Sequence, residues 1–223
     1  IEKNGEVLFQ SGEVLSDSAR DMLTDRSCLS VEGVLDFAST CNLEDVRALI
    51  ERQIDYNYAI AEEGMRHNWG ANIGSVLKEH YGVGIYSRAR YMAAAGSDAR
   101  MSGCEMPVII VSGSGNQGIT ASVPVVEYAK ELNVSRDQMV RAVLLSDLLT
   151  IHLKTGIGRL SAYCGAVSAG CSAGAAIAYL HGGGFREIAH TLVNSLAIVS
   201  GMICDGAKAS CAAKIASSVD AGI

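Results

Sequence analysis

Residues 160–180 read LSAYCGAVSAGCSAGAAIAYL, and this stretch decides the fold. It is 21 residues long, which is the length of a helix that crosses a bilayer. It is built, however, from Ala, Gly, Ser and Cys, with few large apolar side chains to face lipid. Small residues at Gly170, Gly174 and Ala178 recur every four positions, where they allow neighbouring helices to approach closely. We therefore expect the buried central helix of a soluble helical domain rather than a membrane span.

Helical periodicity continues on both sides of this stretch. Ser30, Asn42 and Ser135 stand at positions where their side chains can cap the first turn of a helix. Glycine-rich segments at 112–118, 182–184 and 206 are expected to break helices. The sequence therefore predicts a mainly α fold. Its expected helices are 31–41, 43–67, 71–81, 85–101, 123–133, 136–154, 160–180, 186–204 and 207–220.

The first fifteen residues differ in character from the rest of the chain. Asn4-Gly5 stands between short apolar runs, which is the strongest short-range signal for a β-hairpin. The chain begins with Ile1 rather than Met. We therefore expect residues 1–15 to be the hairpin remnant of a missing N-terminal region, and residues 16–223 to form one helical domain.

Composition narrows the class of protein. The net charge is −6 and the pI is near 5.4, which argues against a nucleic-acid partner, because such proteins present a basic face. No basic segment followed by an apolar one opens the chain, so no secretory signal is recognised. The seven cysteines are odd in number and scattered, which is typical of reduced thiols rather than a disulfide framework. We expect a cytoplasmic protein with no nucleic-acid or membrane partner.

Four of these cysteines lie in the small-residue region, in two pairs that are each spaced by seven: Cys164 with Cys171, and Cys204 with Cys211. Each pair can share one helical face, but core packing produces the same spacing. Cys164 precedes Gly165, and Cys204 begins the segment CDGAK. Thiolates that bind a metal cluster favour such helix breaks, where backbone N–H groups stabilise their charge. The residues alone leave two alternatives open, buried thiols and a cluster site.

A glycine-rich segment, SGSGNQG, follows the β-branched run VIIV at 108–111. Its backbone N–H groups and its Ser and Asn side chains are suited to a carboxylate. The amide oxygens of Asn116 and Gln117 are suited to an ammonium group. No GK[ST] sequence closes the segment, so a P-loop is not indicated, whereas a simple turn remains an alternative. The candidate substrate-binding residues are Ser112, Gly113, Ser114, Gly115, Asn116, Gln117 and Gly118.

Three motifs in this order, GSGNQGITASVPV, YCGAVSAGCSAGAAIAYL and GMICDGAKASCAAK, resemble the α-chain domain of iron–sulfur L-serine dehydratases. The match is closer to their relatives, the L-cysteine desulfidases, and covers roughly residues 85–220. The resemblance implies a cytosolic enzyme with an oxygen-sensitive [4Fe–4S] cluster held by only three cysteines. The fourth iron is then open to the β-hydroxyl or β-thiol of the substrate.

The resemblance also implies roles for individual residues. The three cluster ligands fall on Cys164, Cys204 and Cys211, and Cys171 is left as a core residue. The short CDGAKASC form is similar to the desulfidase branch, since the last two ligands stand further apart in the serine dehydratases. Lys208, beside the cluster motif, is the candidate for the base that removes the α-proton. The alternative is that Lys208 only offsets the negative charge of the cluster.

The implied activity is elimination of hydrogen sulfide from L-cysteine, without pyridoxal phosphate, to give pyruvate and ammonia. L-Serine is the alternative substrate, with water as the leaving group. A different class of protein, a non-catalytic helical scaffold, would keep the same motifs for packing. The expected partners are a small amino-acid substrate, the missing N-terminal segment of the same protein and a second copy of the chain in a homo-oligomer.

Overall fold

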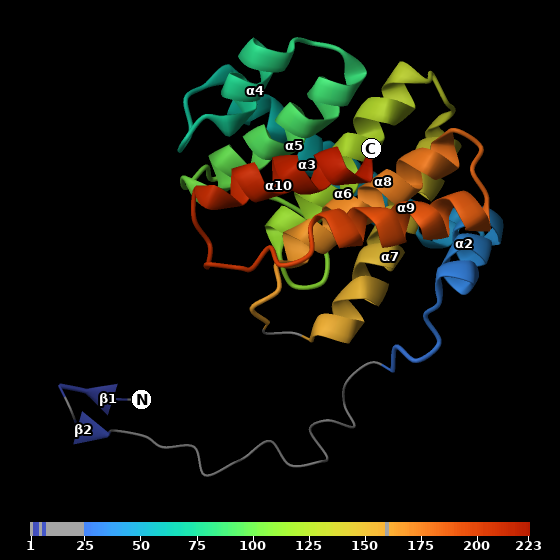
Figure 1. Ribbon diagram of the computed structural model, residues 1–223, viewed down its shortest axis with the longest axis horizontal. Helices are drawn as coiled ribbons and strands as arrows, with labels where there is room; N and C mark the ends of the chain where they lie inside the picture. Colours follow the sequence, from blue (N-terminus) through green and yellow to red (C-terminus); the bar gives the residue numbers. More distant parts are fainter. Residues whose placement is uncertain (1, 5, 8–24, 159–160) are drawn as a thin grey trace.

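A computed structural model describes residues 2–4, 6–7, 25–158 and 161–223 (Figure 1). The helices of the described residues pack into one body, so the predicted mainly α fold is confirmed. These helices are α2 (Val31–Thr40), the 3-10 helix η1 (Leu43–Asp45), α3 (Arg47–Arg66), α4 (Ile73–Tyr81), α5 (Ile85–Met101), α6 (Gly115–Glu131), α7 (Arg136–Ile157), α8 (Gly165–Leu180), α9 (Phe185–Ile198) and α10 (Ser210–Gly222).

Helix α8 is the buried centre of this body. Every residue of α8 from Ala166 to Ile177 is buried, and α6, α7, α9 and α10 pack around it. Figure 1 shows α8 in the middle of the helical layers, beside α9 and α10. The expected central helix is confirmed, although it begins at Gly165 rather than at residue 160. No helix of the described residues is long and apolar enough to cross a membrane.

Small residues on α8 bring its backbone against that of α10. A Cβ atom added to Gly174 would lie 2.1 Å from the carbonyl oxygen of Gly222. One added to Gly170 would lie 2.6 Å from the Cβ atom of Ser218. Since real Cβ atoms do not approach other atoms so closely, only glycine fits at these two positions of α8. The two helices can therefore pack backbone to backbone, as the small-residue spacing predicts.

Two of the three expected capping residues, Ser30 and Ser135, act as predicted, whereas Asn42 caps a different element. The side chain of Ser30 accepts a hydrogen bond from the backbone N–H of Gly33. The side chain of Asn42 caps η1 rather than an α-helix, because α3 begins only at Arg47. Ser135 forms a full capping box at the start of α7. Such caps satisfy backbone N–H groups that have no partner within the helix.

The structure corrects the expected helix break at 112–118. Helix α6 begins at Gly115, so residues 115–118 form its first turn and only 112–114 remain a turn. Ser112 and Gly113 both have positive φ, 48° and 91°, as in the tight turn that pairs Val111 with Ser114. Glycine at 118 serves packing instead, because an added Cβ would lie 2.0 Å from the carbonyl oxygen of Ile109.

The other two expected breaks are confirmed, with one shifted boundary. Residues 182–184 separate α8 from α9, and Gly206, with φ of 97°, lies between α9 and α10. Helix α9, however, ends at Ile198 rather than at residue 204. The connection 199–209 is therefore longer than predicted, and it contains Cys204.

The N-terminal hairpin is not supported as an element of the domain. Glu2–Lys3 (β1) and Glu6–Val7 (β2) pair as antiparallel strands of two residues each, and among the described elements they contact only each other. The rest of the expected hairpin, and the boundary expected between residues 15 and 16, lie outside the described residues. So short a pair contributes nothing to a helical core.

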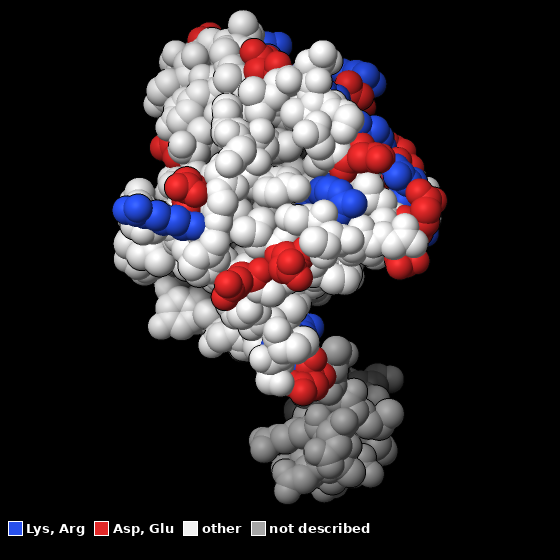
Figure 2. All heavy atoms as spheres, turned by 90° about the vertical axis from the view of Figure 1, so that its right-hand side faces the viewer, with Lys and Arg blue, Asp and Glu red and all other residues white. Residues whose placement is uncertain are grey.

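Charged side chains of both signs are mixed on the surface. On the face shown in Figure 2, basic and acidic groups alternate and no continuous basic patch is seen. Arg47, for example, forms ion pairs with Glu44, Glu51 and Asp137.

The contact between α8 and α10 gives a stability prediction. We expect Gly174→Ala to lower the free energy of unfolding by about 2 kcal/mol or more, because the new methyl group overlaps the backbone of α10. Gly156→Ala is the control, since an added Cβ there meets no atom within 4 Å. It should raise stability by about 0.5–1 kcal/mol, the usual gain of Ala over Gly within a helix. Denaturation followed by circular dichroism measures both, and a Gly174→Ala variant as stable as the wild type would contradict the packing described.

Candidate functional site

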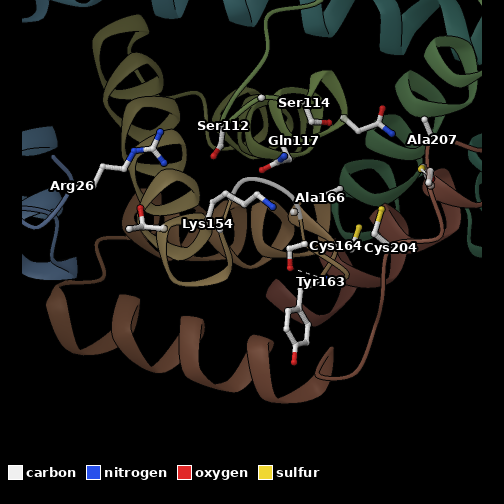
Figure 3. A pocket seen from close by; sticks show the side chains of 18 of the residues that line it. Arg26, Ser112, Ser114, Gln117, Lys154, Tyr163, Cys164, Ala166, Cys204 and Ala207 are labelled. Carbon is white, nitrogen blue, oxygen red and sulfur yellow. Dashed lines mark hydrogen bonds between the residues drawn. The ribbon is translucent and has the colours of Figure 1, made fainter. Parts of the chain in front are cut away.

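One cavity of about 1080 Å³ lies where several helices begin or end. The ends of α5 and α7, the starts of α6 and α8, and the connection that precedes α10 all contribute to its wall. Figure 3 shows Ser112, Ser114 and Gln117 on one side of this cavity, opposite Cys164 and Cys204. Segments that are far apart in the sequence therefore meet around a single space.

The segment before α6 is held in place by α3. The side chain of Asn57 accepts a hydrogen bond from the backbone N–H of Ile109 at 2.8 Å and donates one to its carbonyl oxygen at 3.1 Å. This clamp positions the turn that follows, so that Ser112, Gly113 and Ser114 line the cavity. The clamp explains why the turn has a defined place although it lies between helices.

The expected substrate-binding residues divide into two groups. Ser112, Gly113, Ser114, Asn116 and Gln117 line the cavity. Gly115 and Gly118 are buried and do not line it. Their role in the structure is to permit close packing, of the Arg100 side chain on Gly115 and of the Ile109 backbone on Gly118.

Gln117 joins the starts of two helices. Its side chain is only 5% exposed and lies against Gly165, where an added Cβ would be 2.6 Å from the Gln117 carboxamide carbon. The Gln117 Oε1 atom is buried and accepts no hydrogen bond from any described residue. A buried acceptor without a donor is unfavourable, so this atom marks a place where a donor from a ligand would be stabilised.

Cys164, Cys204 and Cys211 line this same cavity. Cys164 is the N-cap residue of α8. The backbone N–H of Cys204 donates to the carbonyl oxygen of Ala162 at 2.6 Å, and Tyr163 forms a β-bridge with Ile203. These contacts attach the connection between α9 and α10 to the start of α8, and so place the thiols of Cys164 and Cys204 on one wall (Figure 3).

The Cys164 thiol lies in a mixed electrostatic environment. Burial raises its pKa, and the backbone N–H groups of Val167 and Ala166 oppose this effect by hydrogen bonding to the sulfur. Cys204 and Cys211 are close enough to raise the pKa of Cys164 further by charge repulsion. Three neighbouring thiolates would repel one another, and a bound cation would relieve this repulsion.

Thiolates are the usual ligands of iron–sulfur clusters, so the chemistry of the three cysteine side chains on the cavity wall fits such a group. In the ranges 25–158 and 161–223, no three His, Cys, Asp or Glu side chains are grouped tightly enough to hold one ion. A cubane cluster binds each thiolate at a different iron atom, so its ligands stand further apart than those of a single ion. Cys164, Cys204 and Cys211 are therefore suitable ligands.

The remaining described cysteines lie apart from this cavity wall. Cys171 is fully buried in α8, and burial raises the pKa of its thiol, as expected for a core residue. Cys28 is exposed, while Cys41 and Cys104 are partly buried. None of these four residues lines the cavity.

Lys208 is not brought to the cavity. Its side chain is exposed and is not part of the cavity wall. Lys214, the other lysine beside the cysteine motif, forms an ion pair with Asp205, which raises the pKa of Lys214 and lowers that of Asp205 to about 2. Ser210 also donates to Asp205, so this cluster closes the turn around Gly206.

Three basic residues of the cavity wall, Arg26, Arg100 and Lys154, were not identified from the sequence. Lys154 is only 7% exposed and extends from the last turn of α7 into the cavity (Figure 3). One signal was available for it, since Ser146, Thr150 and Lys154 are spaced by four and share the buried face of α7. Arg100, in the last turn of α5, carried no comparable signal.

Comparison with known proteins places these features in a family context. The family model for the serine dehydratase alpha chain matches residues 11–223. A UPF0597 protein of Desulfitobacterium hafniense is 61% identical over the whole chain, and one of Lachnoclostridium phytofermentans is 56% identical. A third, from Treponema denticola, is 48% identical. The chain covers 51%, 53% and 53% of these relatives, so it spans about half their length. No solved structure matches the chain.

Thiol exposure gives a prediction that does not depend on any bound group. We expect iodoacetamide at neutral pH to modify Cys204 and Cys28 at least about tenfold faster than Cys164 and Cys171, because only the first two are exposed and burial raises the thiol pKa of the others. Peptide mass spectrometry over a time course measures the four rates. Modification of Cys171 as fast as Cys204 would show that α8 is not the buried helix described.

Proposed function

The chain belongs to the serine dehydratase alpha chain family, and on this premise we propose that it supplies the cluster-binding part of a lyase that does not use pyridoxal phosphate. The proposed reaction converts L-cysteine to pyruvate, ammonia and hydrogen sulfide with the help of a [4Fe–4S] cluster. L-Serine is the second candidate substrate, and loses water in place of hydrogen sulfide. The family itself points to lyase chemistry, whereas the choice of L-cysteine rests on the short spacing between Cys204 and Cys211.

One observation carries this proposal. The three cysteines and the polar turn before α6 line a single cavity, so a leaving group and the rest of a small amino acid have room between them. Cys164, Cys204 and Cys211 would hold the cluster. When bound, it supplies a Lewis-acidic iron that stabilises the departing hydrosulfide or hydroxide.

Polar groups on the opposite wall would orient the amino acid. Gln117 Oε1 has no donor in the structure and would accept a hydrogen bond from the substrate ammonium group. The hydroxyl groups of Ser112 and Ser114 line the same wall and would donate to the substrate carboxylate. Fixing the ammonium and the carboxylate groups, which share the α-carbon, directs the β-carbon toward the cysteines, and such positioning is a major source of catalytic rate.

Lys154 is the proton acceptor that we propose in place of Lys208. It is the one lysine of the described cavity wall, and no carboxylate of the described residues forms an ion pair with it. Its amine nitrogen would take the α-proton, the electron pair of the C–H bond would form the Cα–Cβ double bond, and the β-substituent would leave with its bonding pair. The resulting aminoacrylate hydrolyses to pyruvate and ammonia.

The curated relatives are about twice as long as this chain, and we propose that activity requires the remaining part of the full-length protein. The scaffold hypothesis differs from the lyase hypothesis in one testable way. A scaffold would keep its cysteines for packing only, and loss of a thiol at the cavity would then leave no trace in metal content.

The cysteine assignment predicts different results for two single variants of the full-length protein. After anaerobic reconstitution with iron and sulfide, Cys204→Ala should lose the visible absorption of the cluster and at least about 100-fold of pyruvate formation from L-cysteine. Cys171→Ala, which removes a core thiol away from the cavity, should keep both. Unchanged cluster content in Cys204→Ala would refute the ligand assignment and favour the scaffold hypothesis.

The proton acceptor can be tested with two lysine variants. We expect Lys154→Met to lower kcat for L-cysteine by about 100-fold or more, the usual contribution of a positioned base, with the cluster retained. Lys208→Met is the matched control, because Lys208 is exposed and lies outside the cavity wall. It should change kcat less than about threefold. The reverse order of effects, measured by pyruvate formation, would restore Lys208 as the base.

A further inference from the structure

Arg100 is held at the cavity by a close contact with the backbone of α6. A Cβ atom added to Gly115 would lie 2.3 Å from Arg100 Nε and 2.9 Å from its Cζ. The guanidinium group therefore rests directly on the first residue of α6, in a space that exists only because residue 115 has no side chain. Such a contact fixes a long side chain that would otherwise sample many rotamers.

The guanidinium group of Arg100 has more N–H donors than it uses in hydrogen bonds with described residues. Its Nη1 donates to Asn116 Oδ1 at 3.2 Å, whereas a guanidinium carries five N–H donors. Within the described parts of the chain no carboxylate pairs with Arg100. Two other arginines of the same helix do have such partners, since Arg88 pairs with Glu127 and Glu131 and Arg90 pairs with Asp220.

No carboxylate of the described residues balances the positive charge of Arg100. Burial lowers its pKa, which is the direction expected for a cation with poor access to water, and the influence of Cys211 opposes this only in part. Arginine stays protonated in proteins, so a charged and partly desolvated group faces the cavity. Among the described residues of the cavity wall the one carboxylate is that of Asp25, which is exposed and accepts a hydrogen bond from the backbone N–H of Ser27. An anionic ligand would complete this environment.

A carboxylate matches the arrangement of donors better than other small anions. The planar guanidinium fork binds both oxygens of a carboxylate at once. Ser112 and Ser114 line the cavity beside Asn116, which fixes one edge of the fork. Gln117 Oε1, an acceptor without a donor, follows Asn116 on the same helix turn. A carboxylate and an ammonium group on one carbon atom would satisfy Arg100 and Gln117 together.

We propose that Arg100, positioned by Gly115 and Asn116, anchors the α-carboxylate of the substrate, and that the site therefore accepts only amino acids whose carboxylate is free. This inference rests on the proposed function and deepens it. Cysteine and serine would bind, whereas cysteamine and ethanolamine, which lack the carboxylate, would be rejected. The alternative role of Arg100 is to balance the negative charge of the cluster ligands. Among these, Cys211 raises the pKa of Arg100.

Binding to iron-free full-length protein separates these two roles. Calorimetric titration with L-serine and with ethanolamine should give at least about tenfold tighter binding of L-serine to the wild type, because hydrogen bonds to a charged group discriminate by roughly this factor. Arg100→Gln should abolish the preference, and Arg100→Lys should keep part of it. Arg66→Gln, which changes an exposed arginine of α3, should behave as the wild type.

A second variant guards against a simple folding defect. Gly115→Ala leaves the arginine in the chain but occupies the space on which its guanidinium rests, so it should weaken L-serine binding about as much as Arg100→Gln while circular dichroism stays unchanged. In the reconstituted protein, Arg100→Gln should keep its cluster and lose at least about tenfold of its preference for L-cysteine over cysteamine.

The outcomes distinguish this inference from the proposed function. If Arg100→Gln still prefers L-serine, or loses its cluster while L-serine binding is kept, Arg100 is not the carboxylate anchor although the lyase assignment stands. If the wild type binds no amino acid and forms no pyruvate from L-cysteine or L-serine, the proposed function fails together with the inference. Loss of the preference for L-serine in both Arg100→Gln and Gly115→Ala, with the cluster intact, supports Arg100 as the carboxylate anchor.

Discussion

The close approach of α8 to its neighbours is the constraint on which the rest of the structure depends. Gly170 and Gly174 let the backbone of α10 touch that of α8, and Gly165 lets Gln117 of α6 lie across the first turn of α8. Larger side chains at any of these positions would push the helices apart. The starts of α6 and α8 would then no longer face a common cavity, and Cys164 would move away from the turn at 112–114.

This arrangement gives the cavity its electrostatic character. Two helix N-termini border it, and each carries a partial positive charge from its unpaired backbone N–H groups. The guanidinium group of Arg100 adds a full positive charge, and the buried Lys154 side chain lines the same cavity. Positive charge nearby favours thiolates and carboxylates, and so opposes the effect of burial on the Cys164 thiol. An anionic cluster and an amino-acid carboxylate are therefore compatible occupants of one site.

Local sequence patterns predicted the helices better than they predicted the site. Caps at Ser30 and Ser135, and the small-residue run of α8, carry their structural information locally. The start of α6 at Gly115 was missed because glycine and asparagine are poor helix formers, and the contact of Gly118 with the Ile109 backbone becomes evident only in three dimensions. Arg100 was missed for a similar reason, since its lack of a carboxylate partner depends on how distant helices pack. The grouping of the three cysteines followed from the family resemblance, whereas their spacing alone left it undecided.

The proposed chemistry depends above all on a cluster that three cysteines hold and that leaves one iron open to the substrate. Mössbauer spectroscopy of the full-length protein, reconstituted without oxygen from iron-57 and sulfide, tests this most directly. We expect a [4Fe–4S] spectrum in which a single iron site changes when L-cysteine or L-serine is added. A protein that takes up no cluster, or a cluster in which no iron site responds to either amino acid, would contradict it.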